Sequence, residues 1–153
     1  MSGVGKNLSR QSGPCEQGWI NAHLEGLGCI LIGNEQGTFK DGNSFCYSNS
    51  AHLVEVLTEG QMDYIVTELQ LLESLVGRRW YLGGGTDWNS EGRWYWANSL
   101  IPLEEFVWAE SQPNDGISAD FFVFWPNGRY YGADEGHHPD RQDIFYPICQ
   151  KFM

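Results

Sequence analysis

The stretch TEGQMDYIVTELQLLESLVGRRWYLGG, residues 58–84, predicts a helix followed directly by a strand. Thr58 and Gln61 form a capping-box pattern at the start of the helix, and Gly77 is a residue type that commonly ends one. Apolar residues recur between them at helical spacing and predict one buried stripe, made of Met62, Ile65, Val66, Leu69, Leu72 and Val76. Residues 78–84 then predict a strand that runs into a glycine turn.

Shorter elements are predicted on both sides of this unit. Residues 37–46 predict a second helix, weakened by Gly42 and Asn43, which have low helix propensity. Asn127-Gly128 is a typical hairpin turn between two strands. The remaining strands are expected in residues 19–32, 52–57, 119–125, 129–131 and 145–152. Strands and two helices come first and a loop-rich β half follows, so the predicted fold class is α+β.

The stretch from Gly83 to about Gly116 is rich in turn residues. A compact domain seldom carries so long an irregular segment unless the segment is functional. Four tryptophans in and after it are predicted to pack mostly in the core: Trp94, Trp96, Trp108 and Trp125. Tyr130 and Tyr131 are expected to be exposed instead, with polar tips suited to contact a glycan or a protein.

Composition narrows the classes of function. The 153 residues fit one domain, with residues 1–14 as a flexible polar tail and residues 15–153 as the folded part. A net charge of −11 argues against binding nucleic acid, whose phosphates it repels, and is compatible with cation binding. No apolar run is long enough to span a membrane, and residues 1–14 contain no signal peptide. No nucleophile, phosphate-binding or dinucleotide-binding motif appears, so we expect no enzyme.

Four cysteines stand at positions 15, 29, 46 and 149. An even count fits two disulfides, with three possible pairings. No CxxC motif is present, which argues against a zinc ribbon or a thioredoxin-like site. The cysteines therefore favour an oxidising, extracellular location.

Several short motifs occur in an order that resembles the C-type lectin-like domain, in its long form with an N-terminal hairpin. They are Cys15-x-x-Gly18-Trp19, Trp80-Tyr81-Leu82-Gly83, Glu91-Gly92-Arg93-Trp94-Tyr95-Trp96, Trp108-x3-Gln112-Pro113-Asn114-Asp115 and Pro147-Ile148-Cys149-Gln150. The resemblance runs from about Cys15 to Lys151. It implies two helices flanking small antiparallel sheets with a long loop region, and the disulfide pairs Cys15–Cys29 and Cys46–Cys149.

The sequence departs from this family at the disulfide that usually braces the long loop. Its two cysteines would fall near Phe121-Phe122 and near Glu135 or Gly136, and both are absent. We expect Phe121 or Phe122 to fill the space by packing.

In sugar-binding members of the family, calcium and two sugar hydroxyls share one set of oxygen ligands. The resemblance assigns oxygen donors to Gln112, Asn114 and Asp120, and it suggests a cis Gln112–Pro113 peptide. The family's Asn-Asp pair is replaced by Tyr131 and Gly132, which offer no carboxylate, although Tyr131 remains a candidate sugar contact. Asp134 or Glu135 would supply the missing acid only if that strand bulges. Calcium is a hard ion that needs six to eight oxygens, so its binding is left open here.

A second calcium site of the family matches Asp87, Glu91 and Asp115, although these acids also recur in members that bind no calcium. A further cluster of metal-ligand residue types is Asp134, Glu135, His137, His138, Asp140 and Asp143, which we interpret as a solvated acidic loop.

Three functions remain open at this point. The first is a secreted carbohydrate-binding module of lectin type that binds glycans with or without calcium. The second is a calcium-independent domain that binds a protein through the long loop. The third is an acidic protein associated with matrix or mineral, motivated by the net charge of −11.

Overall fold

The structure is a computed structural model that describes residues 15–113, 121–127, 129–135 and 145–152. Its elements, in chain order, are β2 Ile20–Asn21, β3 Cys29–Ile32, α1 Phe39–Ser48, β4 His52–Leu53, α2 Glu59–Val76, β5 Trp80–Thr86, β6 Tyr95–Trp96, η1 Glu105–Val107, β7 Phe121–Asn127, β8 Arg129–Glu135 and β9 Phe145–Lys151. The prediction of a flexible tail over residues 1–14 lies outside the described residues.

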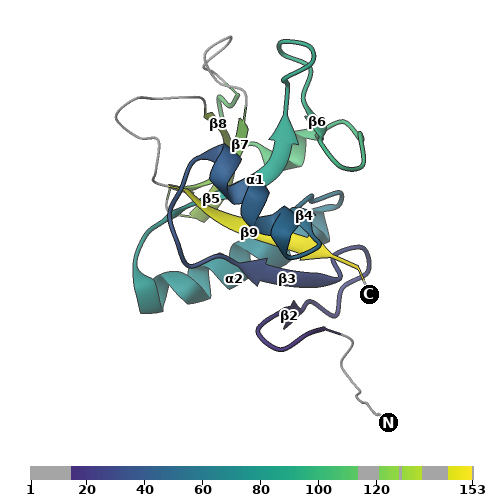
Figure 1. The fold of residues 1–153 in the computed structure, drawn as a ribbon. Coiled ribbons are helices and arrows are strands. Elements are labelled where there is room, and N and C mark those ends of the chain that lie inside the picture. The colour runs from purple at the N-terminus through teal and green to yellow at the C-terminus, as the bar shows by residue number, and fades with distance from the viewer. Residues whose placement is uncertain (1–14, 114–120, 128, 136–144, 153) are drawn as a thin grey trace.

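The strands form one mixed sheet in the order β2-β3-β9-β5-β7-β8, with β4 beside β9 and β6 beside β5 (Figure 1). β9 pairs antiparallel with β3 along one edge, and its other edge pairs with β5 and β4. The strands pair antiparallel as expected, except that β5 and β9 run parallel. The α+β class is confirmed. The last strand of the chain therefore holds together segments from its first half.

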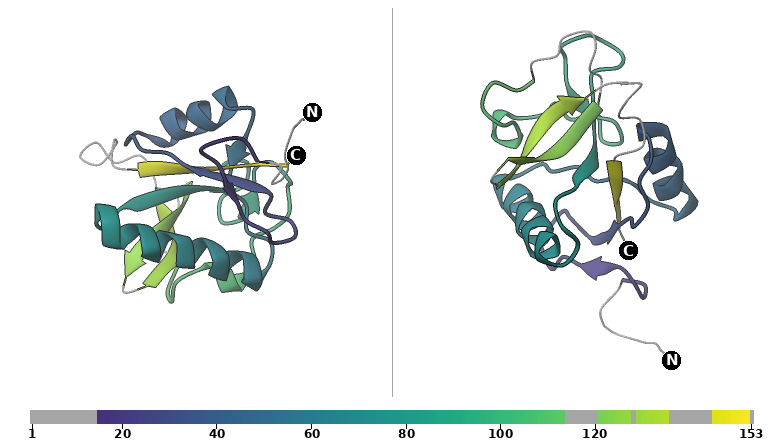
Figure 2. Two further views of the ribbon diagram at one scale, coloured as in Figure 1. Left: turned by 90° about the horizontal axis from the view of Figure 1, so that it is seen from below. Right: turned by 90° about the vertical axis from the view of Figure 1, so that its left-hand side faces the viewer.

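The two helices lie on opposite sides of the sheet (Figure 2). On α2 the predicted stripe is buried at Met62, Ile65, Val66 and Leu69 but not at Val76, which is 39% exposed. The capping box at Thr58 is only half present. The Thr58 hydroxyl accepts from the Gln61 N–H at 3.1 Å, but the Gln61 side chain accepts from the Leu57 N–H at 2.7 Å instead.

Helix α1 begins at a full capping box that the sequence analysis did not identify. The Thr38 hydroxyl accepts from the Asp41 N–H, and the Asp41 carboxylate accepts from the Thr38 N–H, both at 3.0 Å. Gly42, which weakens the helix locally, allows it to approach the sheet. A Cβ there would lie 2.7 Å from Leu82 Cδ1 and 3.2 Å from Pro147 Cβ. Packing against β5 and β9 therefore offsets the low propensity of this glycine.

Residues 54–57 were predicted as a strand but form an irregular buried segment after the short β4. The Glu55 N–H donates to the Gln150 side chain at 3.0 Å, and the Glu55 carboxylate accepts from the Asn98 N–H at 2.6 Å. Side chains thus form the hydrogen bonds to the backbone that a neighbouring strand would otherwise form. This segment connects the sheet to the long loop region.

The predicted glycine turn at the end of β5 is absent, because the strand continues through Gly83–Gly85 to Thr86. The return strand β8 extends to Glu135, beyond the predicted residues 129–131. β7 and β8 pair residue for residue from Phe121↔Glu135 to Asn127↔Arg129. This hairpin forms the sheet edge beside the long loop region.

Two disulfides join Cys15 to Cys29 and Cys46 to Cys149, so the pairing implied by the family resemblance is confirmed. The second bond ties α1 to β9 across 103 positions of sequence. Within the described ranges, no helix combines the length and apolar composition needed to cross a bilayer.

Candidate functional site

The long loop region opens at Asp87, directly after β5. Asp87 is 1% exposed, and its Oδ2 accepts from the Gly92 N–H at 2.8 Å. The Asp87 carbonyl also accepts from the Ser90 N–H at 3.0 Å, so one acid closes the turn with side chain and backbone. The second carboxylate oxygen, Oδ1, is buried and has no hydrogen-bond partner among the described residues. A buried carboxylate oxygen without a partner costs free energy unless a proton or a cation satisfies it.

The other two residues of the predicted second calcium site are only partly described. Glu91 lies exposed in the turn that Asp87 closes, and Asp115 lies outside the described residues. Across the part of the chain that the structure describes, no three His, Cys, Asp or Glu residues are grouped so as to hold a metal. The loop cluster His137, His138, Asp140 and Asp143 also lies outside that part.

The Gln112–Pro113 peptide is cis, as predicted. Gln112 is half-buried, and its N–H donates to the Ala109 carbonyl at 3.0 Å. The Ala109 N–H in turn donates to the Gly132 carbonyl at 2.8 Å, so this loop is attached to β8. Its neighbours Asn114 and Asp120 lie outside the described residues.

Gly132 occupies the position where the family resemblance places a calcium-binding carboxylate. A Cβ on Gly132 would lie 2.2 Å from the Val107 carbonyl oxygen and 2.4 Å from Phe122 Cε2. Gly132 also forms a bridge with Trp108. No side chain fits here without moving both neighbours, so the local packing excludes an acid as well as the sequence does.

Phe122 explains why the space is closed. It is fully buried, and its ring packs edge-on against Trp96 at 5.3 Å, Trp108 at 5.4 Å and Phe124 at 5.1 Å between centroids. This confirms the expectation that a phenylalanine packs where the loop disulfide is missing. The ring near the position of the missing cysteine therefore lies against the glycine at the position of the missing carboxylate.

The structure does not provide the bulge that would bring Asp134 or Glu135 into the place of Tyr131 and Gly132. Along the described part of the hairpin, the β7–β8 register is continuous. The side chains of Tyr130 and Tyr131 lie outside the described part. The expectation that tryptophans pack in the core holds for Trp96, which is 1% exposed.

Trp88 is a candidate that the sequence analysis missed. It is 69% exposed, and its ring stacks on Phe121 at 6.3 Å between centroids with 12° between planes. Phe121 stacks in turn on Phe39 at 3.9 Å and 11°. The Trp88 N–H donates to the Thr86 hydroxyl at 3.1 Å. The sequence did contain a signal for this candidate, because Trp88 stands among turn residues and outside any apolar stripe.

Comparison with known proteins gives consistent results. No family model matches the chain. A similar solved structure is the mouse scavenger receptor C-type lectin carbohydrate-recognition domain, at 25% identity and TM-score 0.71, covering 90% of this chain and 96% of that one. The human counterpart also shares 25% identity, with TM-score 0.70 and coverage of 91% and 99%.

A third similar structure has lower sequence identity and shares only the fold with this chain. A calcium-independent type II antifreeze protein has TM-score 0.70 at 20% identity and covers 90% of this chain and 94% of that one. Its description and those of the scavenger receptors show that this fold serves more than one function. The strand order, the two helices, the two disulfides and these likenesses agree, and the chain has the C-type lectin-like fold.

Proposed function

We propose that the chain is a secreted glycan-binding module of lectin type, whose sugar contacts centre on Trp88 and the Gln112–Pro113 loop. The observation that carries this proposal is the exposed, stacked ring of Trp88. The apolar C–H face of a sugar ring packs against an aromatic face, and nearby polar groups then orient its hydroxyls. The carbohydrate-recognition domains among the similar structures support the same class of ligand.

Trp88 is well prepared for such a contact. Its ring stacks on Phe121, which stacks in turn on Phe39, so this contact restrains the side chain before a sugar binds. In the sequence, Phe121 directly follows Asp120, which is a predicted sugar ligand. Gln112 and Asn114 would complete the set of amide and carboxylate groups that accept from and donate to hydroxyls.

In this proposal, calcium stabilises the long loop region. Asp87, Glu91 and Asp115 would hold the ion, and the buried Asp87 Oδ1 without a partner fits a cation there. Gly132 leaves no room for the carboxylate that would complete a second cage with Gln112, Asn114 and Asp120. Sugar binding is therefore proposed to depend on stacking and on hydrogen bonds more than on a shared ion. The two disulfides support an oxidising, extracellular setting.

Trp88→Ala should weaken binding to the best glycan of a broad array by at least about tenfold, or about 1.4 kcal/mol. The physical reason is the loss of the stacking face while the backbone of the loop stays bonded to Thr86. Affinities are measured by titration of the soluble glycan in calcium and again in EDTA. The control is Tyr47→Ala, which removes an aromatic ring that is 83% exposed on α1 and should leave affinity unchanged.

Two results would count against the proposed function. One is an array without binding above background in either calcium or EDTA. The other is a Trp88→Ala protein that binds as tightly as the parent chain.

Calcium at about 100 times its dissociation constant should raise the melting temperature by about 5–10 °C, which corresponds to about 2.7 kcal/mol. Asp87→Asn should abolish this rise because the ion loses a charged ligand. In EDTA the variant should differ from the parent by no more than about 1 kcal/mol, since its amide oxygen still accepts from the Gly92 N–H. Melting curves in EDTA and in a calcium series test both statements. An equal rise in parent and variant would place the ion elsewhere.

A calcium-independent protein-binding domain is the second candidate, and the packed Gly132 favours it because the sugar-binding cage of the family is incomplete. The glycan array separates the two candidates. Protein binding is favoured if no glycan binds and Trp88→Ala retains the parent's melting temperature.

A further inference from the structure

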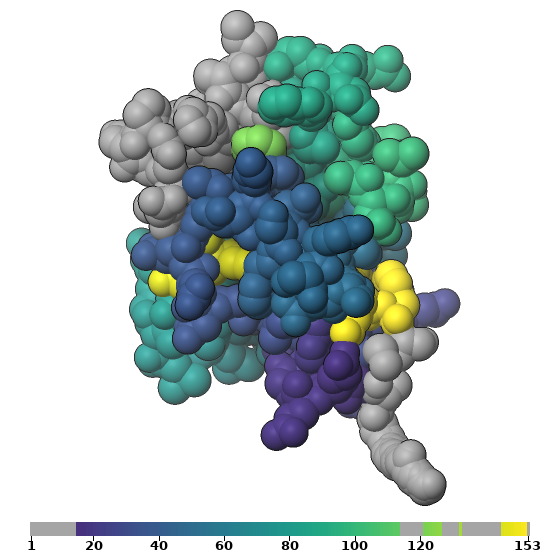
Figure 3. Space-filling model, viewed as in Figure 1, coloured from purple at the N-terminus to yellow at the C-terminus, as the bar shows by residue number. Residues whose placement is uncertain are grey.

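A pocket of about 450 Å³ lies between helix α1, the segment Gly33–Gly37 and strand β9. In the space-filling view, yellow β9 is visible at the bottom of an opening between two blue segments (Figure 3). No residue that lines this pocket belongs to the long loop region from Asp87 to Gly116. The pocket is therefore separate from the residues proposed to bind glycans.

The pocket results from an interruption of the β3–β9 ladder. Gly33 N–H donates to the Pro147 carbonyl at 2.8 Å, but Pro147 has no N–H to return the bond. The register Ile32↔Ile148 would continue to Glu35↔Phe145, yet Gly37 takes the place opposite Phe145. The segment thus carries two extra residues, 37 − 35, and bows away from β9.

Both ends of the bowed segment are held, so the opening is part of the fold. Gly37 N–H donates to the Phe145 carbonyl at 2.9 Å, and Phe145 N–H donates back to Gly37 at 3.2 Å. Helix α1 then starts at the Thr38 capping box and covers the other side. The Cys46–Cys149 disulfide fixes the helix to β9.

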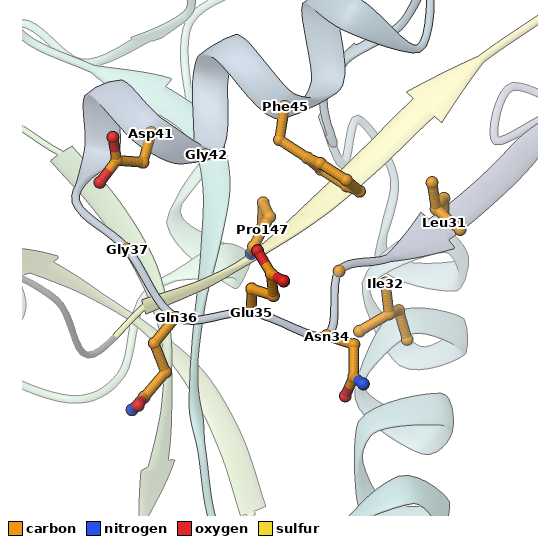
Figure 4. Close-up of a pocket in the computed structure, with 11 residues that line it drawn as sticks. Leu31, Ile32, Asn34, Glu35, Gln36, Gly37, Asp41, Gly42, Phe45 and Pro147 are labelled. Carbon is orange, nitrogen blue, oxygen red and sulfur yellow. The ribbon is translucent and has the colours of Figure 1, made fainter.

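The walls are apolar and the polar rim is acidic. The Phe45 ring points from α1 toward the bowed segment, Pro147 lies behind it, and the Glu35 side chain points toward them (Figure 4). Asp41 lies at the start of α1, where one of its oxygens accepts from the Thr38 N–H. The lining includes two carboxylates, Glu35 and Asp41, and none of the described lining residues is Lys, Arg or His.

We propose that this pocket binds a small organic cation with an apolar body and a protonated amine. The volume lies in the range of small-molecule sites, which are mostly apolar with a few polar groups that orient the ligand. The body would pack between Phe45 and Pro147, and the amine would lie beside the Glu35 carboxylate. The net charge of −11 further favours a cation over an anion.

The test uses three probes that share one apolar body: 4-phenylbutylamine, 4-phenylbutanol and 4-phenylbutanoate. Each is titrated into the whole chain at low salt, and binding is followed by NMR through the backbone amides of Gly33, Gly37 and Gly42, which line the pocket. The amine should bind about threefold to fivefold more tightly than the alcohol, as expected for a partly exposed ion pair, and the anion should bind least. High salt should reduce the preference for the amine.

Two variants and a control make the test specific. Glu35→Gln keeps the shape of the side chain and should give the amine and the alcohol equal affinity. Phe45→Ala removes an apolar wall and should weaken both by about tenfold. Glu104→Gln changes an exposed carboxylate outside the pocket and should change nothing. Glycan binding should stay unchanged in all three, which separates this proposal from the proposed function.

The proposal is overturned if the parent binds amine and alcohol equally, or if Glu35→Gln keeps the preference for the amine. It is also overturned if the probes shift amides elsewhere, or if the shifts do not saturate. If Phe45→Ala fails to fold, the comparison of Glu35→Gln with the parent still tests the proposal. The Glu35 side chain is exposed, so its replacement by glutamine requires no repacking.

Discussion

Replacing both Cys46 and Cys149 with alanine should lower the free energy of unfolding by about 4–5 kcal/mol. The bond closes a loop across 103 positions, and in the chain-entropy account such a crosslink removes about that much conformational freedom from the unfolded chain. Cys149 also lies opposite Leu31 of β3 and Leu53 of β4, so the bond fixes α1 to the strand that joins three parts of the sheet. Chemical denaturation with a fitted slope measures the change.

The Cys15–Cys29 bond provides the matched control. It closes a loop of only 14 positions in the N-terminal hairpin, so its removal by the same double substitution should cost about 3 kcal/mol. Equal losses for the two pairs, or a loss below about 1 kcal/mol for Cys46 and Cys149, would mean that loop closure does not govern the stability of this fold.

Gly132→Ala should destabilise the domain by about 3 kcal/mol or more. The new Cβ would lie 2.2 Å from the Val107 carbonyl oxygen and 2.4 Å from Phe122 Cε2, far inside normal contact distances. Overpacking of a dense core costs about 1–3 kcal/mol and more when backbone atoms must move. Gly60→Ala is the control. Its Cβ would meet only Thr58 Oγ1 at 3.9 Å on helix α2, so this change should stabilise by about 0.5–1 kcal/mol.

A double-mutant cycle tests whether Phe122 and Gly132 are coupled. Phe122→Ala alone should cost about 3–5 kcal/mol, since it empties a fully buried site between tryptophans. The double variant Phe122→Ala with Gly132→Ala should cost at least about 1 kcal/mol less than the sum, because one of the two clashes disappears. Additive losses would show that the two departures from the family pattern are independent.

The contact between Phe122 and Gly132 limits which substitutions could give this site a calcium-binding carboxylate. An acid cannot be restored at position 132 by substitution there alone, because the Phe122 ring and the Val107 carbonyl occupy the space. Gly132→Asp should therefore unfold the domain and should not create a calcium ligand. A sugar site that relies on Trp88 and the Gln112–Pro113 loop needs no such restoration.

Local patterns predicted the elements that local forces decide. Helix α2 was identified from apolar periodicity between Thr58 and Gly77, and both residues lie at its ends. The strand prediction failed over residues 54–57, where Gln150, almost a hundred positions away, takes the Glu55 N–H. Such a bond leaves no trace in the sequence around Glu55.

The candidate site was predicted only in part, for the same reason. The order of the motifs identified the family resemblance and the disulfide pairs, and it singled out Gln112 and Asp87. It did not single out Trp88, because the stacking of Trp88 on Phe121, and of Phe121 on Phe39, joins distant parts of the chain.

By itself, the sequence determined the helix before β5, the order of motifs that defines the lectin-like fold, and which oxygen donors the long loop retains. Only the tertiary structure decided that Gly132 has no room for a side chain, that β9 joins both halves of the chain, and that Pro147 opens a pocket beside α1. The physical reason is the distance along the chain over which each effect acts. Propensity and periodicity act over a few residues, whereas close packing depends on atoms that the chain brings together from far apart.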